Sequence, residues 1–240
     1  MDKQYTFQDF RQIVDTLRSE NGCPWDREQT HESLKPCMTE EAAELVAAIR
    51  IYDKTGNAEN MREELGDILL QVVMHSRIAQ EEGLFTLDDV VQEISEKMVR
   101  RHPHVFGDIY VDSSDEVLRN WDEIKKAEKA DKEWIPSPLQ EIPRELPALV
   151  RAPKVLKKVD KLYEAQADSE DVIARMSESV STLTEAVRTS NKTGMEQEIG
   201  DLLMQLAQLS RLYKLPLEQI LTDKIEDIVE KHEPIEKNVV

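Results

Sequence analysis

Apolar residues recur at intervals of three and four along residues 64–77, which is the spacing of one buried stripe on a helix. The stripe consists of Leu65, Ile68, Leu69, Val72 and Val73. A polar stripe runs beside it on the same helix and consists of Glu64, Asp67, Gln71 and His75. The pattern predicts an amphipathic helix that carries carboxylates at the border of its buried face.

A second apolar stripe precedes this helix and consists of Ala42, Leu45, Val46 and Ile49. Thr39 is expected to cap the helix that carries it. Between the two helices, the segment 53–60 contains Gly56 and Asn57 and therefore predicts a turn. The simplest arrangement is an antiparallel helical pair within a four-helix bundle.

The helix at 64–77 recurs in the second half of the chain. Residues 64–71 (ELGDILLQ) are echoed by residues 198–205 (EIGDLLMQ), and Ser76-Arg77 falls in register with Ser210-Arg211. Similarity of this kind predicts the duplication of one helical module.

A proline-rich stretch separates the two copies. Five of the ten prolines lie between Pro136 and Pro153, and proline removes a helical hydrogen-bond donor. We therefore expect two domains at residues 1–135 and 151–240, joined by a linker at 136–150.

Composition supports helices and restricts the partners. The 240 residues include only 7 glycines and 5% aromatic residues, which favours an all-α fold. A net charge of -18 disfavours a role on nucleic-acid polymers or on anionic membranes. A charged N-terminus and the lack of a long apolar segment predict a cytoplasmic protein, in which Cys23 and Cys37 are reduced.

Four carboxylates have spacings that place them in pairs on the two helices of the predicted hairpin: Glu41 and Glu44, and Glu64 and Asp67. Two such charges about 5 Å apart repel each other by roughly 3 kcal/mol at an effective dielectric constant near 20. Convergence therefore requires protonation, basic partners or bound cations, and magnesium or manganese suits oxygen ligands. The alternative is a solvated acidic face, in which Glu40 and Glu41 complement the helix dipole. The apolar neighbours of Glu64 and Asp67 favour convergence.

A basic segment follows and consists of Lys97, Arg100 and Arg101. These side chains either receive a polyphosphate or complement the dipole at a helix C-terminus. His102 and His104 flank a proline and are expected to shape a loop rather than bind a metal. Farther on, Trp121 and Lys125 lie four residues apart on an acidic amphipathic helix, where they either hold a nucleotide or serve packing.

The order and spacing of these motifs resemble the MazG nucleoside triphosphate pyrophosphohydrolases over nearly the whole chain. The motifs are GCPWD at 22–26, EEAAE at 40–44, EELGD at 63–67, RRHPHVF at 100–106, the segment 121–125 and IPRELPAL at 142–149.

The resemblance implies an all-α, Mg²⁺-dependent homodimer of tandem helical-bundle domains, with Mn²⁺ as a substitute ion. Such an enzyme cleaves nucleoside triphosphates (NTPs and dNTPs) to the monophosphate and pyrophosphate. The residues that match metal ligands of the family are Glu41, Glu44, Glu64 and Asp67. Those that match nucleotide-binding positions are Lys97, Arg100, Arg101, Trp121 and Lys125. The general base is expected at Glu40 or Glu44.

The second copy departs from this pattern. Glu198 and Asp201 remain, but Ser181 stands where a second upstream carboxylate is expected. When His102 is aligned with His232, acidic residues replace the basic ones: Asp227 stands opposite Lys97 and Glu230 opposite Arg100. We therefore expect a catalytic N-terminal copy and a structural or regulatory C-terminal copy, in which Glu198 and Asp201 either retain binding or do not.

Two rival interpretations use the same acidic helices. A di-iron carboxylate bundle requires Glu-x-x-His motifs, which these helices lack. A non-catalytic acidic dimerisation or adaptor protein is the stronger rival, although it leaves the basic segment unexplained.

Overall fold

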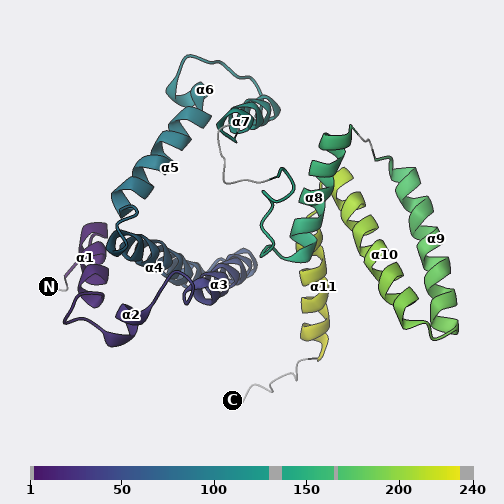
Figure 1. Cartoon of the computed structure of the whole chain (residues 1–240), viewed down its shortest axis with the longest axis horizontal. Coiled ribbons are helices and arrows are strands. Elements are labelled where there is room, and N and C mark those ends of the chain that lie inside the picture. The colour runs from purple at the N-terminus through teal and green to yellow at the C-terminus, as the bar shows by residue number, and fades with distance from the viewer. Residues whose placement is uncertain (1–2, 130–136, 165–166, 233–240) are drawn as a thin grey trace. The chain divides into compact units, whose positions relative to one another are not determined.

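The structure is a computed structural model that describes residues 3–129, 137–164 and 167–232. It divides into two compact units, Met1–Lys129 and Ala130–Val240. Within the described ranges every regular element is a helix (Figure 1), and the predicted all-α class is confirmed. None of the described helices is both long enough and apolar enough to cross a membrane.

Two long antiparallel helices dominate the first unit. Its helices are α1 (Phe7–Leu17), α2 (Pro24–Glu28), α3 (Lys35–Thr55), α4 (Glu59–Glu81), α5 (Leu87–Arg101), α6 (Pro103–Phe106) and α7 (Ser114–Lys129). The longest, α3 and α4, form the predicted hairpin, and the turn between them is confirmed. α3 stops at Gly56, whose φ of 72° lies in the left-handed region that glycine adopts without strain.

The predicted start of α3 is wrong. Thr39 lies inside the helix, where its hydroxyl donates to the carbonyl of Lys35 at 3.1 Å, and no side chain caps the N-terminus at Leu34. The helix begins earlier because Pro36 occupies its first turn, where a missing N–H costs no helical hydrogen bond.

A small aliphatic core joins α1, α3, α4 and α5. Its buried members are Val14, Leu34, Val73, Met74, Ile78 and Leu87, with Phe10, Cys37 and Leu70 packed against them. Both cysteines are free thiols. Since core residues come from the C-terminal half of α4, its N-terminal half remains available for the carboxylates.

Arg18, which follows α1, fixes α1 and α2 to the end of α4. Its side chain is only 4% exposed and forms two bonds with Glu81, at 3.1 Å from Nε and 2.7 Å from Nη2. Its Nη1 donates to the carbonyls of Gln29, at 3.1 Å, and of Asp26. The hydrogen bond from Arg18 holds the pKa of the Glu81 carboxyl below its usual value of 4.5.

A histidine pair ties the segment before α3 to α4. The Nδ1 atoms of His31 and His75 are 2.8 Å apart, so one ring donates and the other accepts. Burial and the charge of His31 lower the pKa of His75. At most one of the two rings can therefore carry a proton on both nitrogens while this bond exists.

The second unit repeats the hairpin. Its helices are α8 (Ala148–Tyr163), α9 (Ser169–Arg188), α10 (Lys192–Leu212) and α11 (Leu217–His232), with α9 and α10 as the antiparallel pair (Figure 1). α8 begins inside the predicted linker and contains Pro153. Pro153 lies beyond the first turn, so it removes the helical bond to the carbonyl of Leu149 and its ring crowds that carbonyl, which weakens the helix at this point. Lys158 also donates to Glu141 at 3.0 Å, so part of the predicted linker packs on α8.

The duplication extends beyond the motif found in the sequence. Arg77 of α4 pairs with Asp15 of α1 at 3.4 Å, and Arg211 of α10 pairs in the same way with Asp160 of α8. This match makes α8 the counterpart of α1.

The ends of the repeated helices match as well. His102 and His232 each donate from Nδ1 to the carbonyl four residues earlier, at 2.6 and 2.7 Å. This shared contact supports the alignment of α5 with α11.

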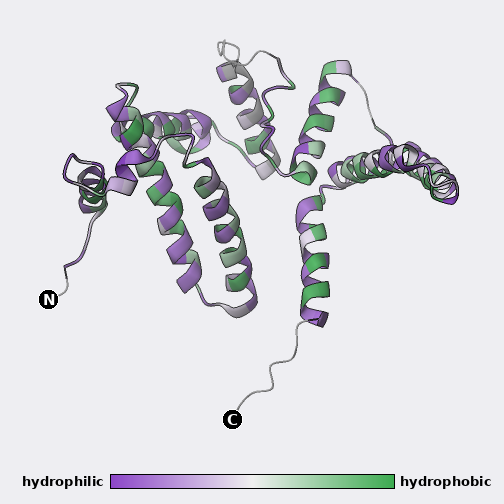
Figure 2. Cartoon of the chain, turned by 60° about the horizontal axis from the view of Figure 1, so that its bottom comes forward, coloured by the Kyte–Doolittle hydropathy of each residue, from purple (hydrophilic) through white to green (hydrophobic). Residues whose placement is uncertain are grey.

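Both hairpins carry exposed apolar side chains in addition to the buried ones. Hydrophobic and hydrophilic residues alternate along these helices (Figure 2). On α3 and α4 the exposed apolar residues include Val46, Ile49, Leu65, Leu69 and Val72. All five belong to the two stripes that the sequence predicted to be buried, so for these residues that prediction is wrong within this unit. Each hairpin therefore presents more apolar surface than its own unit covers.

Replacing Arg18 with Met is expected to lower the free energy of unfolding by about 3 kcal/mol at neutral pH, because it leaves Glu81 and two carbonyls without their buried partner. The pKa of Glu81 is lower in the folded state than its unfolded value of 4.5. The ion pair therefore stabilises the fold fully at pH values above 4.5, and this stabilisation is lost as the pH falls through the folded-state pKa. The difference between wild type and variant should therefore shrink in acid.

Urea unfolding followed by tryptophan fluorescence measures this effect, since Trp25 and Trp121 lie in the first unit. Exposed Arg27→Met is the matched control and should cost about 0.5 kcal/mol or less. Equal losses in the two variants would contradict the anchoring role of Arg18.

Candidate functional site

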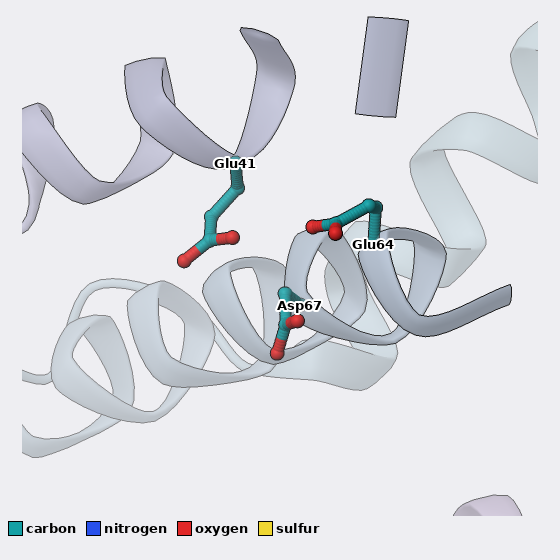
Figure 3. Close-up of side chains that lie close together, drawn as sticks. All are labelled: Glu41, Glu64 and Asp67. Carbon is teal, nitrogen blue, oxygen red and sulfur yellow. The ribbon is translucent and has the colours of Figure 1, made fainter. Parts of the chain in front are cut away.

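Three carboxylates converge where α3 packs against α4. Glu41 projects from α3 toward Glu64 and Asp67 of α4 (Figure 3). One carboxylate oxygen from each of the three lies within 4.8 Å of the others. They converge because residues three apart share a helical face, and the hairpin brings the two faces together.

The cluster carries more negative charge than its surroundings offset. Asn60 donates from Nδ2 to Glu64 at 2.7 Å, but none of the three carboxylates forms an ion pair with a residue that the structure describes. Partial burial, followed by the charge of Asp67, raises the pKa of Glu41, and Glu44, Glu64 and Glu40 add to the effect. A compact group of hard oxygen donors without countercharge fits a divalent cation such as Mg²⁺.

The other two predicted acidic residues lie outside this cluster. Glu40 and Glu44 are exposed, and neither belongs to the group of converging oxygens. Their charges still contribute to the raised pKa of Glu41, with Glu44 the larger contributor of the two. Of the four predicted metal ligands, the structure therefore brings three together and places Glu44 beside them.

Gln71 is a site residue to which the sequence analysis gave no role. It lies one helical turn beyond Asp67 on α4, is 6% exposed, and its Oε1 has no hydrogen-bond partner among the described residues. The sequence signals were its place in the polar stripe with Glu64 and Asp67 and its recurrence as Gln205. A buried acceptor next to a carboxylate cluster is suited to receive a hydrogen bond from a bound water or ligand.

The predicted basic residues gather at the end of α5 around one acidic residue of α7. Glu128 accepts from Arg100 at 2.7 Å and also pairs with Arg101. Its hydrogen bond to Arg101, and then the one to Arg100, lower the pKa of Glu128 to about 2. Lys97 lies one turn before Arg100 and is half-buried. The sequence analysis did not predict that one carboxylate would pair with both arginines.

An aromatic cluster adjoins these arginines. The Arg101 guanidinium lies 5.1 Å from the centroid of the Trp121 ring, and the His102 ring meets the indole edge-on at 5.0 Å. Lys125 follows Trp121 by one turn on α7, and the prediction of a helix there is confirmed. His102 ends α5, and the residues after it form the short helix α6 rather than the expected loop.

In the second copy, the pattern of burial revises the alignment by one residue. The buried residues of α9 are Val172, Ser179 and Ala186. Their spacing of seven matches Leu34, Glu41 and Ala48 of the first copy, where Leu34 and Ala48 are buried as well. This register places Ser179, rather than Glu178, opposite Glu41, and Thr182, rather than Ser181, opposite Glu44.

Both upstream carboxylates are thus absent from the second copy. Ser179 is 7% exposed and accepts a bond from Gln205 at 3.2 Å. No second group of three converging carboxylate, thiol or imidazole ligands occurs within residues 3–129, 137–164 and 167–232. The two copies therefore differ in the side chains that they place at this position, although both form the same hairpin.

Comparison with known protein families finds two matches to one family, described as the MazG nucleotide pyrophosphohydrolase domain, at residues 29–106 and 167–240. The two matches include the α3–α4 and α9–α10 hairpins, respectively.

Several relatives are similar to most of this chain. One is the nucleoside triphosphate pyrophosphohydrolase/pyrophosphatase MazG of Thermotoga maritima, 39% identical over 96% of this chain and 86% of its own length. Another is the nucleoside triphosphate pyrophosphohydrolase of Escherichia coli strain K12, 40% identical over 83% of this chain and 75% of its own length. The uncharacterized protein YabN of Bacillus subtilis is 45% identical over 91% of this chain, which spans only 44% of that protein.

Mg²⁺ is expected to raise the thermal midpoint of the protein, because a cation bound to the folded hairpin offsets the repulsion among Glu41, Glu64 and Asp67. Asp67→Asn should weaken Mg²⁺ binding at least about tenfold. Losing a residue that only supports a metal ligand costs about tenfold or more, and losing a ligand itself should cost no less. The measurement is the thermal midpoint by circular dichroism across a titration with MgCl₂. Exposed Glu63→Gln on the same helix is the control and should respond like wild type. An equal response of Asp67→Asn and wild type would rule out this cation site.

Proposed function

Because the chain belongs to the MazG nucleotide pyrophosphohydrolase family, we propose that its N-terminal copy hydrolyses nucleoside triphosphates to the monophosphate and pyrophosphate in a Mg²⁺-dependent reaction. The observation that supports this assignment most directly is the convergence of Glu41, Glu64 and Asp67 in the first copy. The names of two relatives specify the same substrate class.

In this proposal, Glu41, Glu64 and Asp67 hold the cation, with Mn²⁺ as a substitute for Mg²⁺. A divalent ion bound there neutralises charge on the triphosphate and makes a bound water more acidic. The oxygen-only donor set supports a hard cation over zinc or iron, which favour nitrogen or sulfur ligands. Asn60 keeps Glu64 oriented toward the cluster through its 2.7 Å bond.

We assign the general base to Glu44, with Glu40 as the alternative. A base must keep its charge and reach the attacking water, and it cannot do so while fully engaged as a ligand. Glu44 lies one turn from Glu41, is exposed, and stands outside the group of converging oxygens. Its stronger effect on the pKa of Glu41 supports Glu44 over Glu40 as the nearer of the two.

The nucleotide is proposed to bind at the basic and aromatic cluster. Lys97, Arg100 and Arg101 are the phosphate-binding groups, because guanidinium and ammonium donors match phosphate oxygens. Trp121 offers a face for the base and Lys125 a further positive charge. Since Glu128 already pairs with both arginines, an arriving phosphate must exchange with that carboxylate.

The C-terminal copy is proposed to lack catalysis. Serine and threonine occupy the positions of Glu41 and Glu44 in the register set by burial, so two of the four acidic positions have lost their charge. Asp227 and Glu230 occupy the positions of Lys97 and Arg100. A site that has lost one cation ligand, the general base and two of the three phosphate-binding side chains is suited to a structural or regulatory role.

The proposed active form is a homodimer in the cytoplasm, where nucleoside triphosphates are synthesised and consumed. The exposed apolar stripes of the α3–α4 hairpin support association with a second copy, since such stripes are normally covered. The net charge of -18 supports the use of free nucleotides rather than polymers as partners.

Glu44→Ala is expected to lower the turnover number by about a hundredfold or more, because general-base catalysis contributes at least that much. Asp201→Ala tests the second copy and should leave the turnover number unchanged. Both are measured as pyrophosphate release from a panel of NTPs and dNTPs, with and without Mg²⁺. A loss at Asp201 that equals or exceeds the loss at Glu44 would overturn the assignment of catalysis to the first copy. No release from any substrate would favour the adaptor alternative.

Glu128→Gln is expected to lower KM for the nucleotide about tenfold at low ionic strength, because it removes the carboxylate that competes with phosphate for Arg100 and Arg101. Steady-state kinetics over a range of salt concentrations measures the effect, which should fade as salt rises. Glu123→Gln, exposed on the same helix, should leave KM unchanged. An unchanged or higher KM in Glu128→Gln would show that the two arginines do not bind the substrate.

A further inference from the structure

The side chain of Gln71 has no role in the proposed function, although it lies next to the cluster of three carboxylates. It follows Asp67 by one turn of α4, so both side chains lie on one face of the helix. Farther along α4, Val73 and Met74 belong to the aliphatic core. Gln71 therefore lies at the border between the candidate cation site and the apolar packing of the hairpin.

The amide of Gln71 contains a buried hydrogen-bond acceptor that has no donor. The residue is 6% exposed, and its Oε1 has no partner among the described residues. Leaving a buried carbonyl oxygen unpaired costs free energy, whereas an apolar side chain at this position would extend the core without that cost. A hydrogen bond that the amide forms when the site is occupied would account for the polar side chain.

The second copy shows how far such an amide reaches across the hairpin. Gln205 stands at the position of Gln71 in the repeated motif, and its Nε2 donates to the hydroxyl of Ser179 at 3.2 Å. Ser179 occupies the position of Glu41 in the register set by burial. A glutamate side chain extends farther from the backbone than a serine side chain does. The carboxylate of Glu41 therefore lies within reach of the amide of Gln71.

An amide already supports another carboxylate of the cluster. Along α4, one amide side chain stands four residues before Glu64 and one stands four residues after Asp67. The first of these, Asn60, donates from Nδ2 to Glu64 at 2.7 Å. Glu41 points toward the acidic pair from α3 (Figure 3), and no described residue donates a hydrogen bond to its carboxylate. Gln71 is thus placed to do for Glu41 what Asn60 does for Glu64.

We propose that Gln71 is a positioning residue of the cation site, whose amide Nε2 donates to the Glu41 carboxylate and holds it toward Glu64 and Asp67. This assignment rests on the proposed function of the three carboxylates as cation ligands. The terminal torsion of a glutamine is broad, so the unbonded amide can turn toward Glu41. A donor that fixes the orientation of a metal ligand strengthens metal binding, and its loss weakens binding about tenfold or more.

Isothermal titration calorimetry of the full chain with MgCl₂ tests the proposal without reference to hydrolysis. Gln71→Met removes the donor and keeps the length of the side chain, and we expect it to weaken Mg²⁺ binding about tenfold. Its thermal midpoint without Mg²⁺ should equal or exceed that of wild type, because the variant no longer buries an unpaired acceptor. Gln80→Met makes the same change at an exposed position of α4 and should bind Mg²⁺ like wild type.

Gln71→Leu provides a second apolar variant, and circular dichroism establishes that each variant retains its helices. If both variants of Gln71 bind Mg²⁺ like wild type, the positioning role is overturned while the proposed function stands. A lower thermal midpoint of both variants without Mg²⁺ would show a structural role and would also overturn the proposal. If wild type itself binds no Mg²⁺, the proposed cation site is wrong and the role of Gln71 is refuted with it.

Discussion

Carboxylates that face one another across a helical hairpin repel one another, and this repulsion opposes the packing of the two helices. In the first unit, α3 and α4 withstand this repulsion because the C-terminal half of α4 contributes Val73, Met74 and Ile78 to an aliphatic core. The acidic half of the same helix is thereby held against α3, and the pKa of Glu41 rises in response. The candidate cation site thus depends on apolar packing two turns away, and its charge can be offset by an ion that the fold itself does not supply.

The two copies show which parts of this arrangement are structural. Both keep the hairpin, the arginine that pairs with the preceding helix, and the histidine bond that ends the last helix. Lys214 even adopts the left-handed backbone, at φ 54°, that Gly83 adopts in the first copy. Groups that face the site have changed, as when Ser179 replaces Glu41. Such a pattern separates the residues that build the scaffold from those that determine what each copy can bind.

Periodicity was enough to predict the helices, the hairpin and the pairing of Glu41 with Glu64 and Asp67, because a helical stripe fixes which side chains share a face. It failed where tertiary contacts decide. Thr39 has the chemistry of a cap, but Pro36 starts the helix earlier. The one-residue shift that places Ser179 opposite Glu41 became visible only from burial. The pairing of Glu128 with Arg100 and Arg101 joins segments 27 or more residues apart, and no local pattern encodes such a contact.

The net charge of -18 conceals carboxylates in different settings. In the first copy, carboxylate oxygens lie within 4.8 Å of one another, and this convergence suits a single compact ion. In the second copy, the exposed carboxylates of the α9–α10 hairpin form no such group among the described residues. Glu128 shows a further use of acidity, since it pairs with Arg100 and Arg101 at the end of α5. The spacing of the carboxylates therefore determines which of them can hold a compact ion, whereas their total number only makes the surface unfavourable for polyanions.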